Sequence, residues 1–340
     1  MSGPRVVVVG GLHPRGKPSE TMGEPGPLYA HSICGATYGI AAALSQHGYD
    51  AVPWEGWSAG PIKADALFVS ERNFFDGIVR NKLWDLSKPC VVWLHDASPG
   101  NTFTEKDLAK VTAGICFTRR EALLLFASQA GPHPRHPYWV APWGFPTWWT
   151  MPPVTPNPYP PGTKNIVYAG RIEPGGRIRD IISHVARRFP DVGIWIITDC
   201  VVPDIRNELT SFPNVTWLGA LCHGTFLHYL YYADLALDTG IVTARRANNC
   251  KLWDYLACGV PVIMDGTTGG DDLVLYTGNG AIVPARDYEA YLDAVERGLS
   301  GQFTREQRDT TIRYMKENWT WEAVVRRWVG HFQEVIPPCA

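Results

Sequence analysis

The chain has 340 residues, of which 45% are hydrophobic, 12% aromatic and 19% charged. This length suits about two folded domains, and the composition excludes a chain that is disordered throughout. Because 31 Lys and Arg residues stand against 33 Asp and Glu residues, the formal net charge is −2, which excludes a protein that coats nucleic acid through bulk positive charge.

The apolar segments and the cysteine pattern indicate in which cellular compartment the protein is expected. No apolar run approaches the ~20 residues of a membrane span. The N-terminus has no long apolar segment and no small-residue cleavage site, so we expect neither a transmembrane segment nor a signal peptide. None of the eight cysteines forms a C-x-x-C pair, and several lie in apolar stretches, which predicts buried free thiols. These observations favour a cytoplasmic protein.

The first half of the chain alternates short apolar runs with helix-like stretches, the pattern of a parallel sheet covered by helices. The expected strands are 5–9, 51–53, 66–69, 90–94, 114–117 and 138–141, and the expected helices are 32–47 and 119–128. Glycine or polar residues follow several of these strands, namely Gly10-Gly11, Glu71 and His95-Asp96. Ligands of such sheets lie where the strands end, so these residues are candidates for binding.

A proline-rich stretch, residues 146–164, separates the two halves. Proline lacks a backbone N–H and fixes φ, so we expect no helix there and predict an extended linker at 151–164. The expected strands after it are 165–169, 193–198, 215–218, 235–237, 261–264 and 280–283, and the expected helices are 178–189, 224–232, 251–258, 288–298 and 305–333, the last broken near Asn318. The sequence therefore predicts an α/β protein with two Rossmann-like, doubly wound domains facing a cleft, at residues 1–150 and 165–318. The G-x-G-x-x-G fingerprint is absent, which disfavours a nicotinamide enzyme.

Four segments of the second half carry a family resemblance. They are 165–172 (NIVYAGRI), 214–238 (NVTWLGALCHGTFLHYLYYADLALD), 251–265 (KLWDYLACGVPVIMD) and 319–322 (WTWE). In order and spacing they resemble the nucleotide-sugar domain of GT-B glycosyltransferases, particularly the retaining family 4, over about residues 165–335. The resemblance implies the GT-B fold, with a last helix at 319–336 that crosses back to the first domain, and glycosyl transfer from a nucleotide sugar.

The resemblance assigns a catalytic and donor-binding role to the turn after strand 165–169. Gly170 lets the chain turn close to a ligand, and Arg171 holds the donor diphosphate and stabilises the departing nucleotide. The family's Lys five residues after this arginine is replaced by Gly176, and Arg177 beside it is the expected substitute. A surface arginine next to a turn is the alternative for Arg171.

Further donor contacts are implied around the helix expected at 251–258. Asp254 stands where the family has a Glu that receives the ribose hydroxyls, and an Asp favoured by the helix dipole is the alternative. Arg246 replaces the family's other Glu, a charge reversal that leaves the sugar undetermined. Asn249 or Asn248 is expected to cap the helix. Lys251 belongs with Arg245 and Arg246 to a basic cluster near the phosphates, or else to a solvated basic face.

In the first half the resemblance is limited to strand order and a glycine in the first helix. It implies that Gly11 and Gly35 approach the donor and that His95 is catalytic, in contact with the donor sugar or an acceptor hydroxyl. Glu71 and Asp96 are interpreted as acceptor-binding. The structural alternatives are a packing glycine, a hydrogen-bonded histidine and an aspartate that caps a turn.

Tryptophan is abundant, with 14 residues. Aromatic faces stack on sugar rings and bases, but packing in the core or at a hinge is the interpretation we favour for most of them. The noted positions are Trp54, Trp57, Trp139, Trp143, Trp148 and Trp149.

The predicted reaction is transfer of a hexose from a UDP- or GDP-linked sugar, UDP-glucose among them, to a hydroxyl of a small molecule, saccharide, lipid carrier or modified DNA base. The resemblance implies retention of configuration, and because no D-x-D motif is present we expect no metal cofactor. Three alternatives stay open: a viral-type glycosyltransferase acting on hydroxymethylated DNA bases, a non-catalytic sugar-nucleotide binding module, and a nucleotide-sugar epimerase. The oligomeric state is undetermined.

Overall fold

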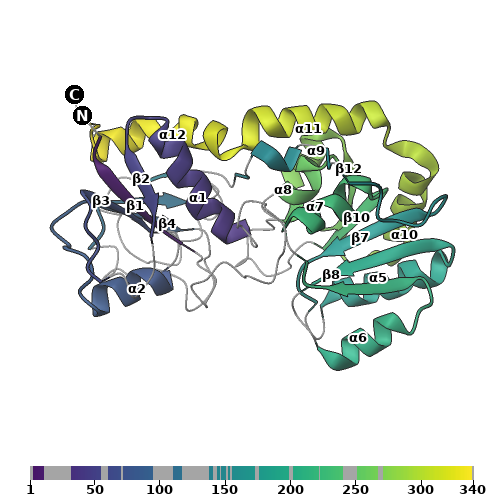
Figure 1. Cartoon of the computed structure of the whole chain (residues 1–340). Coiled ribbons are helices and arrows are strands. Elements are labelled where there is room, and N and C mark those ends of the chain that lie inside the picture. The colour runs from purple at the N-terminus through teal and green to yellow at the C-terminus, as the bar shows by residue number, and fades with distance from the viewer. Residues whose placement is uncertain are drawn as a thin grey trace. The chain divides into compact units, whose positions relative to one another are not determined.

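The computed structural model describes residues 3–10, 32–54, 60–69, 72–94, 110–116, 138–140, 144–145, 147–150, 152–153, 155–172, 176–198, 202–221, 223–239, 251–266 and 271–338. These residues divide into two compact units, each described by itself below (Figure 1). Unit 1 comprises the described residues up to Phe145 together with those from Asn318 onward. Unit 2 comprises the described residues from Thr147 to Glu317.

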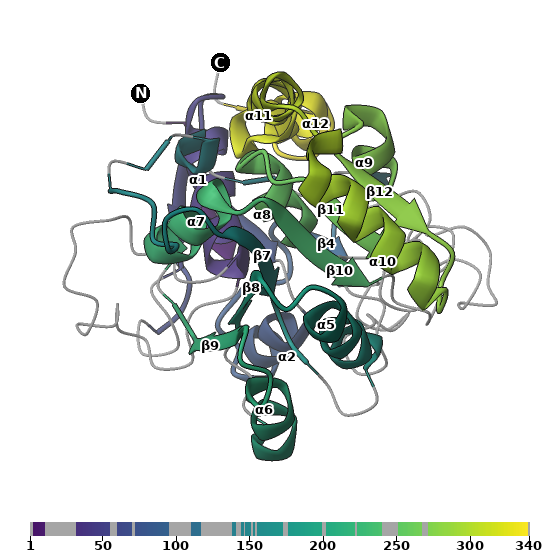
Figure 2. The ribbon, with the colours of Figure 1, turned by 90° about the vertical axis from the view of Figure 1, so that its right-hand side faces the viewer.

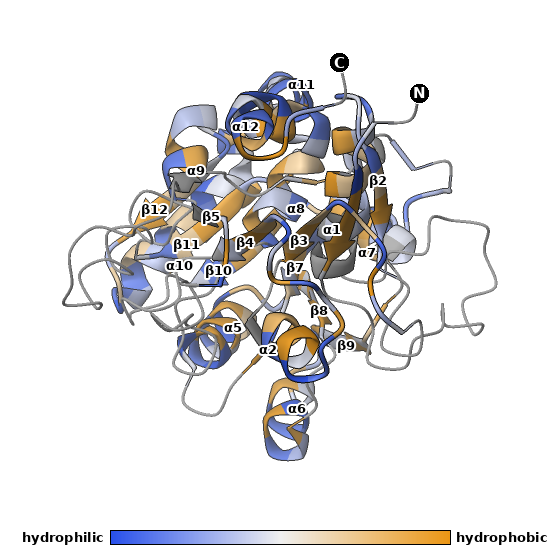
Figure 3. Cartoon of the chain, turned by 90° about the vertical axis from the view of Figure 1, so that its left-hand side faces the viewer, coloured by the Kyte–Doolittle hydropathy of each residue, from blue (hydrophilic) through white to orange (hydrophobic). Residues whose placement is uncertain are grey.

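Six described strands of unit 1 form a parallel sheet in the order β2-β1-β3-β4-β5-β6. Its elements are β1 (Arg5–Val9), α1 (Ser32–Ser45), β2 (Asp50–Pro53), β3 (Ala66–Val69), α2 (Arg72–Arg80), β4 (Cys90–Leu94), β5 (Ala113–Cys116) and β6 (Tyr138–Val140). Strand β3 is buried along its whole length, and Figure 3 shows β3 and β4 as hydrophobic strands. Strands covered on both faces have such continuous apolar runs, as the sequence predicted.

Helix α12 (Trp321–Val335), from the far end of the chain, completes unit 1. The ring of Trp321 lies so close to Gly39 of α1 that a side chain at Gly39 would overlap it. Near the end of the helix, the Tyr49 hydroxyl donates a hydrogen bond to the Ile336 carbonyl at 2.6 Å. The core of unit 1 therefore depends on residues that are almost 300 positions apart in the chain.

Six described strands of unit 2 form a second parallel sheet, in the order β12-β11-β10-β7-β8-β9. The strands are β7 (Lys164–Ala169), β8 (Val192–Ile197), β9 (Val215–Gly219), β10 (Leu235–Thr239), β11 (Val262–Asp265) and β12 (Gly280–Val283). The helices are α5 (Arg177–Arg188), α6 (Pro203–Thr210), α7 (His223–Tyr232), α8 (Lys251–Ala257), α9 (Asp271–Thr277), α10 (Tyr288–Arg297) and α11 (Arg305–Trp319), whose last two residues belong to unit 1. The prediction of two parallel α/β sheets is confirmed.

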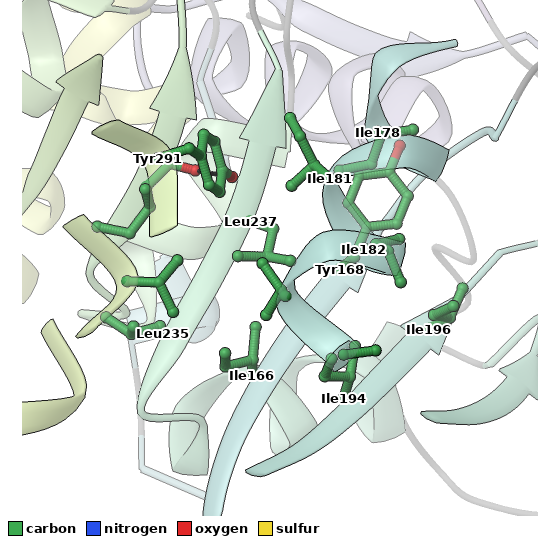
Figure 4. Packing of buried hydrophobic residues seen from close by; sticks show 14 of the residues in the cluster. Ile166, Tyr168, Ile178, Ile181, Ile182, Ile194, Ile196, Leu235, Leu237 and Tyr291 are labelled. Carbon is green, nitrogen blue, oxygen red and sulfur yellow. Dashed lines mark hydrogen bonds between the residues drawn. The ribbon is translucent and has the colours of Figure 1, made fainter. Parts of the chain in front are cut away.

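The main core of unit 2 lies between its sheet and helices α5, α6 and α10, which Figure 2 shows on one side of the strands. Isoleucines of α5 meet those of β7 and β8, and Tyr291 of α10 closes the cluster (Figure 4). The Tyr291 hydroxyl donates to the Ile263 carbonyl at 2.6 Å. Branched aliphatic side chains fill this space closely, and the hydroxyls of Tyr168 and Tyr291 are both hydrogen-bonded, as buried polar groups require.

The proline-rich linker differs from the prediction in two ways. It is preceded by a one-turn 3-10 helix, η2 (Thr147–Thr150), where no helix was expected. Its later part is attached to unit 2, because Tyr159 is buried and its hydroxyl donates to the Tyr229 carbonyl at 2.7 Å. Proline density excludes an α-helix but does not prevent a single turn before it or side-chain packing beside it.

Three short helices, α2, α6 and α9, were not predicted, because each has nine residues or fewer and so gives too few turns for an apolar period to identify it. The break expected near Asn318 is confirmed, since α11 ends at Trp319 and Thr320 caps α12. The helix expected at 119–128 lies outside the described residues. Cys90 and Cys258 are buried free thiols, and Trp54 and Trp149 are core residues, as predicted.

Candidate functional site

The carboxyl ends of three neighbouring strands of unit 2 bring charged and polar residues to one edge of its sheet. Strand β7 continues into Gly170 and Arg171, β10 ends in Asp238 and Thr239, and β11 ends in Asp265. In the parallel register of β10 and β11, Thr239 lies opposite Asp265. Binding sites of open α/β sheets occupy this edge.

The turn after β7 has a fixed conformation. Gly170 has φ +131°, a value that residues with a side chain rarely adopt, and its N–H donates to the Ile197 carbonyl at 3.0 Å. The Tyr168 hydroxyl donates to the Arg171 carbonyl at 2.6 Å. The Arg171 side chain is exposed at the end of this turn. No ion pair between described residues involves Arg171.

Lys251, the first residue of α8, lies beside the same turn. Its ammonium is 2.9 Å from Asp238 Oδ1, 3.3 Å from the Tyr168 hydroxyl and 4.6 Å from the centre of the Tyr168 ring. Asp238 is fully buried, and its Oδ1 also accepts the Thr239 N–H at 2.7 Å. Burial alone would lower the pKa of Lys251, but the attraction of Asp238 prevails and raises this pKa, so the lysine is charged at neutral pH.

A glycine at position 170 makes room for this ammonium. A Cβ there would lie 3.4 Å from both Lys251 Nζ and the Tyr168 hydroxyl. One turn further along α8, Tyr255 attaches the helix to the same strand, since its hydroxyl accepts the Ala169 N–H at 2.8 Å. Residues four apart share a helix face, so Lys251 and Tyr255 both reach the end of β7.

A second buried ion pair lies at the end of β11. Arg177, the first residue of α5, donates to Asp265 Oδ2 at 2.5 Å, with 13% of the arginine side chain and 2% of the carboxylate exposed. The same oxygen accepts the Arg286 N–H at 3.3 Å. A guanidinium in this pair balances the charge of a buried carboxylate.

Asp254 is buried on α8, with 6% of its surface exposed, and its Oδ1 has no hydrogen-bond partner among the described residues. Burial raises the pKa of this carboxyl to about 8, so it is protonated at neutral pH. A protonated carboxyl can donate one hydrogen bond as well as accept others. Asp254 lies on the same short helix as Lys251.

The structure brings together three of the predicted donor residues, Gly170, Arg171 and Lys251, and places Arg177 and Asp254 on elements of the same unit. Gly35 lies in the first turn of α1, in unit 1. The other predicted site residues lie outside the described part of the chain: Gly11, Glu71, His95, Asp96, Arg246 and Asn249.

Sequence reasoning missed Tyr168, Asp238 and Asp265. A signal was present for the two aspartates, because each is the acidic residue that ends a buried apolar run, in LALD and VIMD. Among the described residues, no group of three or more His, Cys, Asp or Glu side chains is placed to hold a metal ion. No helix of the described part is both long and apolar enough to cross a bilayer.

No family model matches the chain, and no curated protein matches its sequence. Solved structures do match its fold. HepE (Alr3699) of Anabaena in complex with UDP-glucose is 12% identical, over 97% of this chain and 100% of that chain, with a TM-score of 0.66. Sucrose-phosphate synthase from Thermosynechococcus elongatus is 15% identical, over 88% of this chain and 78% of that chain, with a TM-score of 0.60.

The trehalose 6-phosphate synthase of Burkholderia multivorans is 14% identical, over 79% of this chain and 70% of that chain, with a TM-score of 0.59. These structural neighbours are GT-B glycosyltransferases. The expectation of a GT-B fold is therefore confirmed. At such low identity the likeness shows the fold alone, and membership of the retaining family 4 stays a prediction.

Proposed function

We propose that this protein is a glycosyltransferase that moves a hexose from a nucleoside diphosphate sugar to a hydroxyl acceptor. The observation that carries the proposal is the exposed Arg171 on a rigid glycine turn, at the carboxyl edge of the second sheet of a GT-B fold. Sugar nucleotides are dianions at their diphosphate, and a guanidinium binds two phosphate oxygens at once. The resemblance of the sequence to retaining family 4 supports a retaining, metal-independent reaction.

The charges around Arg171 agree with this role. Lys251 and Arg177 are each paired with a buried carboxylate, whereas Arg171 is exposed and takes part in no ion pair with a described residue. Its guanidinium is therefore available to an anionic ligand. As the sugar–phosphate bond breaks, negative charge grows on the leaving diphosphate, and a pre-positioned cation stabilises that charge without reorganisation.

The neighbouring structures support the choice of donor. HepE was solved with UDP-glucose, with UDP and with UDP and glucose, and the Burkholderia vietnamiensis neighbour is a UDP-forming trehalose-phosphate synthase. We infer from this that UDP-sugars, UDP-glucose first among them, are the donors to test before GDP-sugars. Asp254 is proposed to face the ribose of that donor.

The proposal is tested by thermal shift and turnover with Arg171→Ala. Bound nucleoside diphosphate stabilises the native state by mass action, so UDP is expected to raise the Tm of the natural protein. Arg171→Ala should abolish that shift and lower turnover of UDP-glucose by ~100-fold or more, since a charge-assisted contact to the transition state is lost. The Tm without ligand should change little because the side chain is exposed.

Arg206→Ala is the matched control, because Arg206 is also an exposed arginine of unit 2, on α6. It should leave both the UDP shift and turnover unchanged. An Arg171→Ala variant with the same UDP shift as the natural protein would refute the phosphate assignment. Binding of UDP-glucose with no release of UDP, over a broad panel of hydroxyl acceptors, would favour a non-catalytic binding module instead.

A further inference from the structure

The sheet of unit 2 carries one Lys–Asp pair at each end of strands β7 and β10. At the amino end, Lys164 Nζ lies 3.0 Å from Asp234 Oδ1, and 55% of the lysine side chain and 27% of the aspartate side chain are exposed. At the carboxyl end, Lys251 Nζ lies 2.9 Å from Asp238 Oδ1, with 19% and 0% exposed. The two pairs have the same chemistry, but only the second is held out of water.

A pair held out of water needs an explanation, because the cost of removing two charges from water offsets much of their attraction. An apolar pair of similar size would hold α8 against β10 at least as well. The pair also occupies the edge of the sheet where ligands bind, beside the turn that carries Arg171. Its position therefore favours a role in binding over a role in holding the fold together.

The ammonium of Lys251 is only partly used. Of its three N–H donors, two have described partners, the Asp238 carboxylate and the Tyr168 hydroxyl. The space that Gly170 leaves open lies directly against the nitrogen, since a Cβ there would be 3.4 Å from it. The nitrogen of Lys251, which has one donor left, is thus beside the backbone turn that ends in Arg171.

We propose that Lys251 binds an oxygen of the donor's diphosphate together with Arg171, and that Asp238 is an internal counter-ion which limits how tightly the site holds that diphosphate. This inference rests on the proposed function and deepens it. The counter-ion keeps Lys251 charged and in place before the donor arrives. It also opposes the accumulation of negative charge on the ligand beside it.

The counter-ion has a kinetic consequence. The nucleoside diphosphate product has one more ionisable phosphate oxygen than the sugar nucleotide, so a site of purely positive charge would hold the product more tightly than the donor. A buried carboxylate next to Lys251 acts most strongly against the more negative ligand. Asp238 therefore favours release of the nucleoside diphosphate product. Product release limits turnover in many enzymes.

The experiment measures binding of UDP, GDP and inorganic pyrophosphate to the full chain by calorimetry. Asp238→Asn keeps the bond from Thr239 N–H and removes the charge, so it should tighten binding of UDP on the order of fivefold and lower kcat through slow product release. Lys251→Met should weaken binding of UDP on the order of tenfold or more, the effect of losing a charged hydrogen bond.

A double variant separates binding from folding. Lys251→Met with Asp238→Asn leaves no unpaired buried charge, so it should fold, and it should bind UDP more weakly than Asp238→Asn, in which the lysine is intact. Lys164→Met is the matched control, because it breaks the equivalent pair at the amino end of β7, and its affinity for UDP should equal that of the natural protein.

Four outcomes decide the question. The counter-ion role of Asp238 is supported if Asp238→Asn binds UDP more tightly than the natural protein and the double variant binds UDP more weakly than Asp238→Asn. If neither UDP nor GDP binds, but pyrophosphate binds to the natural protein and its variants with the same order of affinities, the counter-ion role of Asp238 is supported and the proposed UDP- and GDP-sugar donors are refuted. If Asp238→Asn binds UDP no more tightly than the natural protein, or if the double variant binds as tightly as Asp238→Asn, the proposal for Asp238 and Lys251 is overturned and the proposed function is left intact. No binding of any of the three probes overturns both.

Discussion

The two units share an architecture but are stabilised by different parts of the sequence. Unit 2 fills its core with isoleucine, valine and leucine side chains that come from one continuous run of the chain. Unit 1 depends on helix α12, whose aromatic residues pack on strands that lie more than 200 positions earlier. In unit 1 the Phe68 ring stacks on that of Trp328 with centroids 6.2 Å apart, and Trp93 meets Trp321 edge-on at 5.7 Å.

The residues that stabilise unit 1 are therefore different from the residues that form the candidate phosphate site of unit 2. The C-terminal helix closes the core of unit 1, to which it belongs. Every described residue of the candidate phosphate site belongs to unit 2. A substitution in α12 should therefore change how unit 1 unfolds without changing the phosphate ligands, and the predictions below test that separation.

The largest effect is expected from Trp321→Ala. Trp321 is 2% exposed. Its ring lies against Gly39 and Gly144, and a Cβ on either glycine would overlap the ring. Loss of a buried tryptophan from a core costs about 3–5 kcal/mol. In differential scanning calorimetry the transition of unit 1 should fall by many degrees while that of unit 2 stays in place.

Gly330→Ala is the control for this variant, because it lies on the same helix and an added Cβ would contact nothing within 4 Å. It should lower neither transition, and the higher helix propensity of alanine should raise that of unit 1 slightly. A single transition that falls as a whole in Trp321→Ala would mean that the two units unfold together and that their stabilities are not separable.

An effect confined to unit 2, and dependent on pH, is expected from Asp254→Asn. The pKa of Asp254 is about 8 in the folded protein, against 3.8 for an aspartate carboxyl in water. Between these values the native state binds the extra proton and the unfolded state does not, so stability falls as pH rises from about 4 to about 8, by at most about 1.4 kcal/mol per pH unit. Asn cannot ionise, so the variant should lose this dependence.

The measurement is denaturant unfolding of the natural protein and Asp254→Asn across that pH range. The two should have similar stability near pH 4, and the variant should be the more stable one at pH 8. Parallel stability curves for the two proteins would show that Asp254 is ionised in the fold and has a partner that neutralises it.

The smallest effects are expected at two matched helix caps. Thr320 accepts the Ala323 N–H at 3.3 Å at the start of α12, and Asp287 accepts the Ala290 N–H at 3.0 Å at the start of α10. Replacing either cap with alanine costs about 1 kcal/mol. Thr320→Ala should lower only the transition of unit 1, and Asp287→Ala only that of unit 2, in the same calorimetric scan. An equal shift of both transitions in either variant would contradict the division into two units.

The strands were the most predictable part of the fold. Runs such as RVVVV at β1 and NIVYA within β7 are apolar throughout, and a parallel sheet is the fold in which short continuous apolar runs are buried on both faces. Short helices such as α6, which begins with Pro203, were missed, because eight residues give too few turns for a clear period.

The candidate site was predictable in part. The Gly170-Arg171 turn was identified from the resemblance to the nucleotide-sugar domain of GT-B glycosyltransferases, in which glycine and arginine follow a buried strand. The pairing of Lys251 with Asp238 could not be predicted, because the two residues are 13 positions apart on different elements, and only the packing of α8 against the sheet brings them together.

The sequence by itself determined the order of strands and helices, the two α/β units and the glycine turn, because each follows from a local pattern of apolar, helix-capping and turn-forming residues. The tertiary structure decided which charges meet at the end of the second sheet, and which of them are neutralised. It also decided how the last helix packs into the first unit's core, through contacts such as that of Trp321 with Gly39, whereas the family resemblance had implied only that this helix crosses back to the first domain. These features depend on contacts between distant residues, and the free energy of such a contact comes from burial and pairing that exist only once the chain has folded.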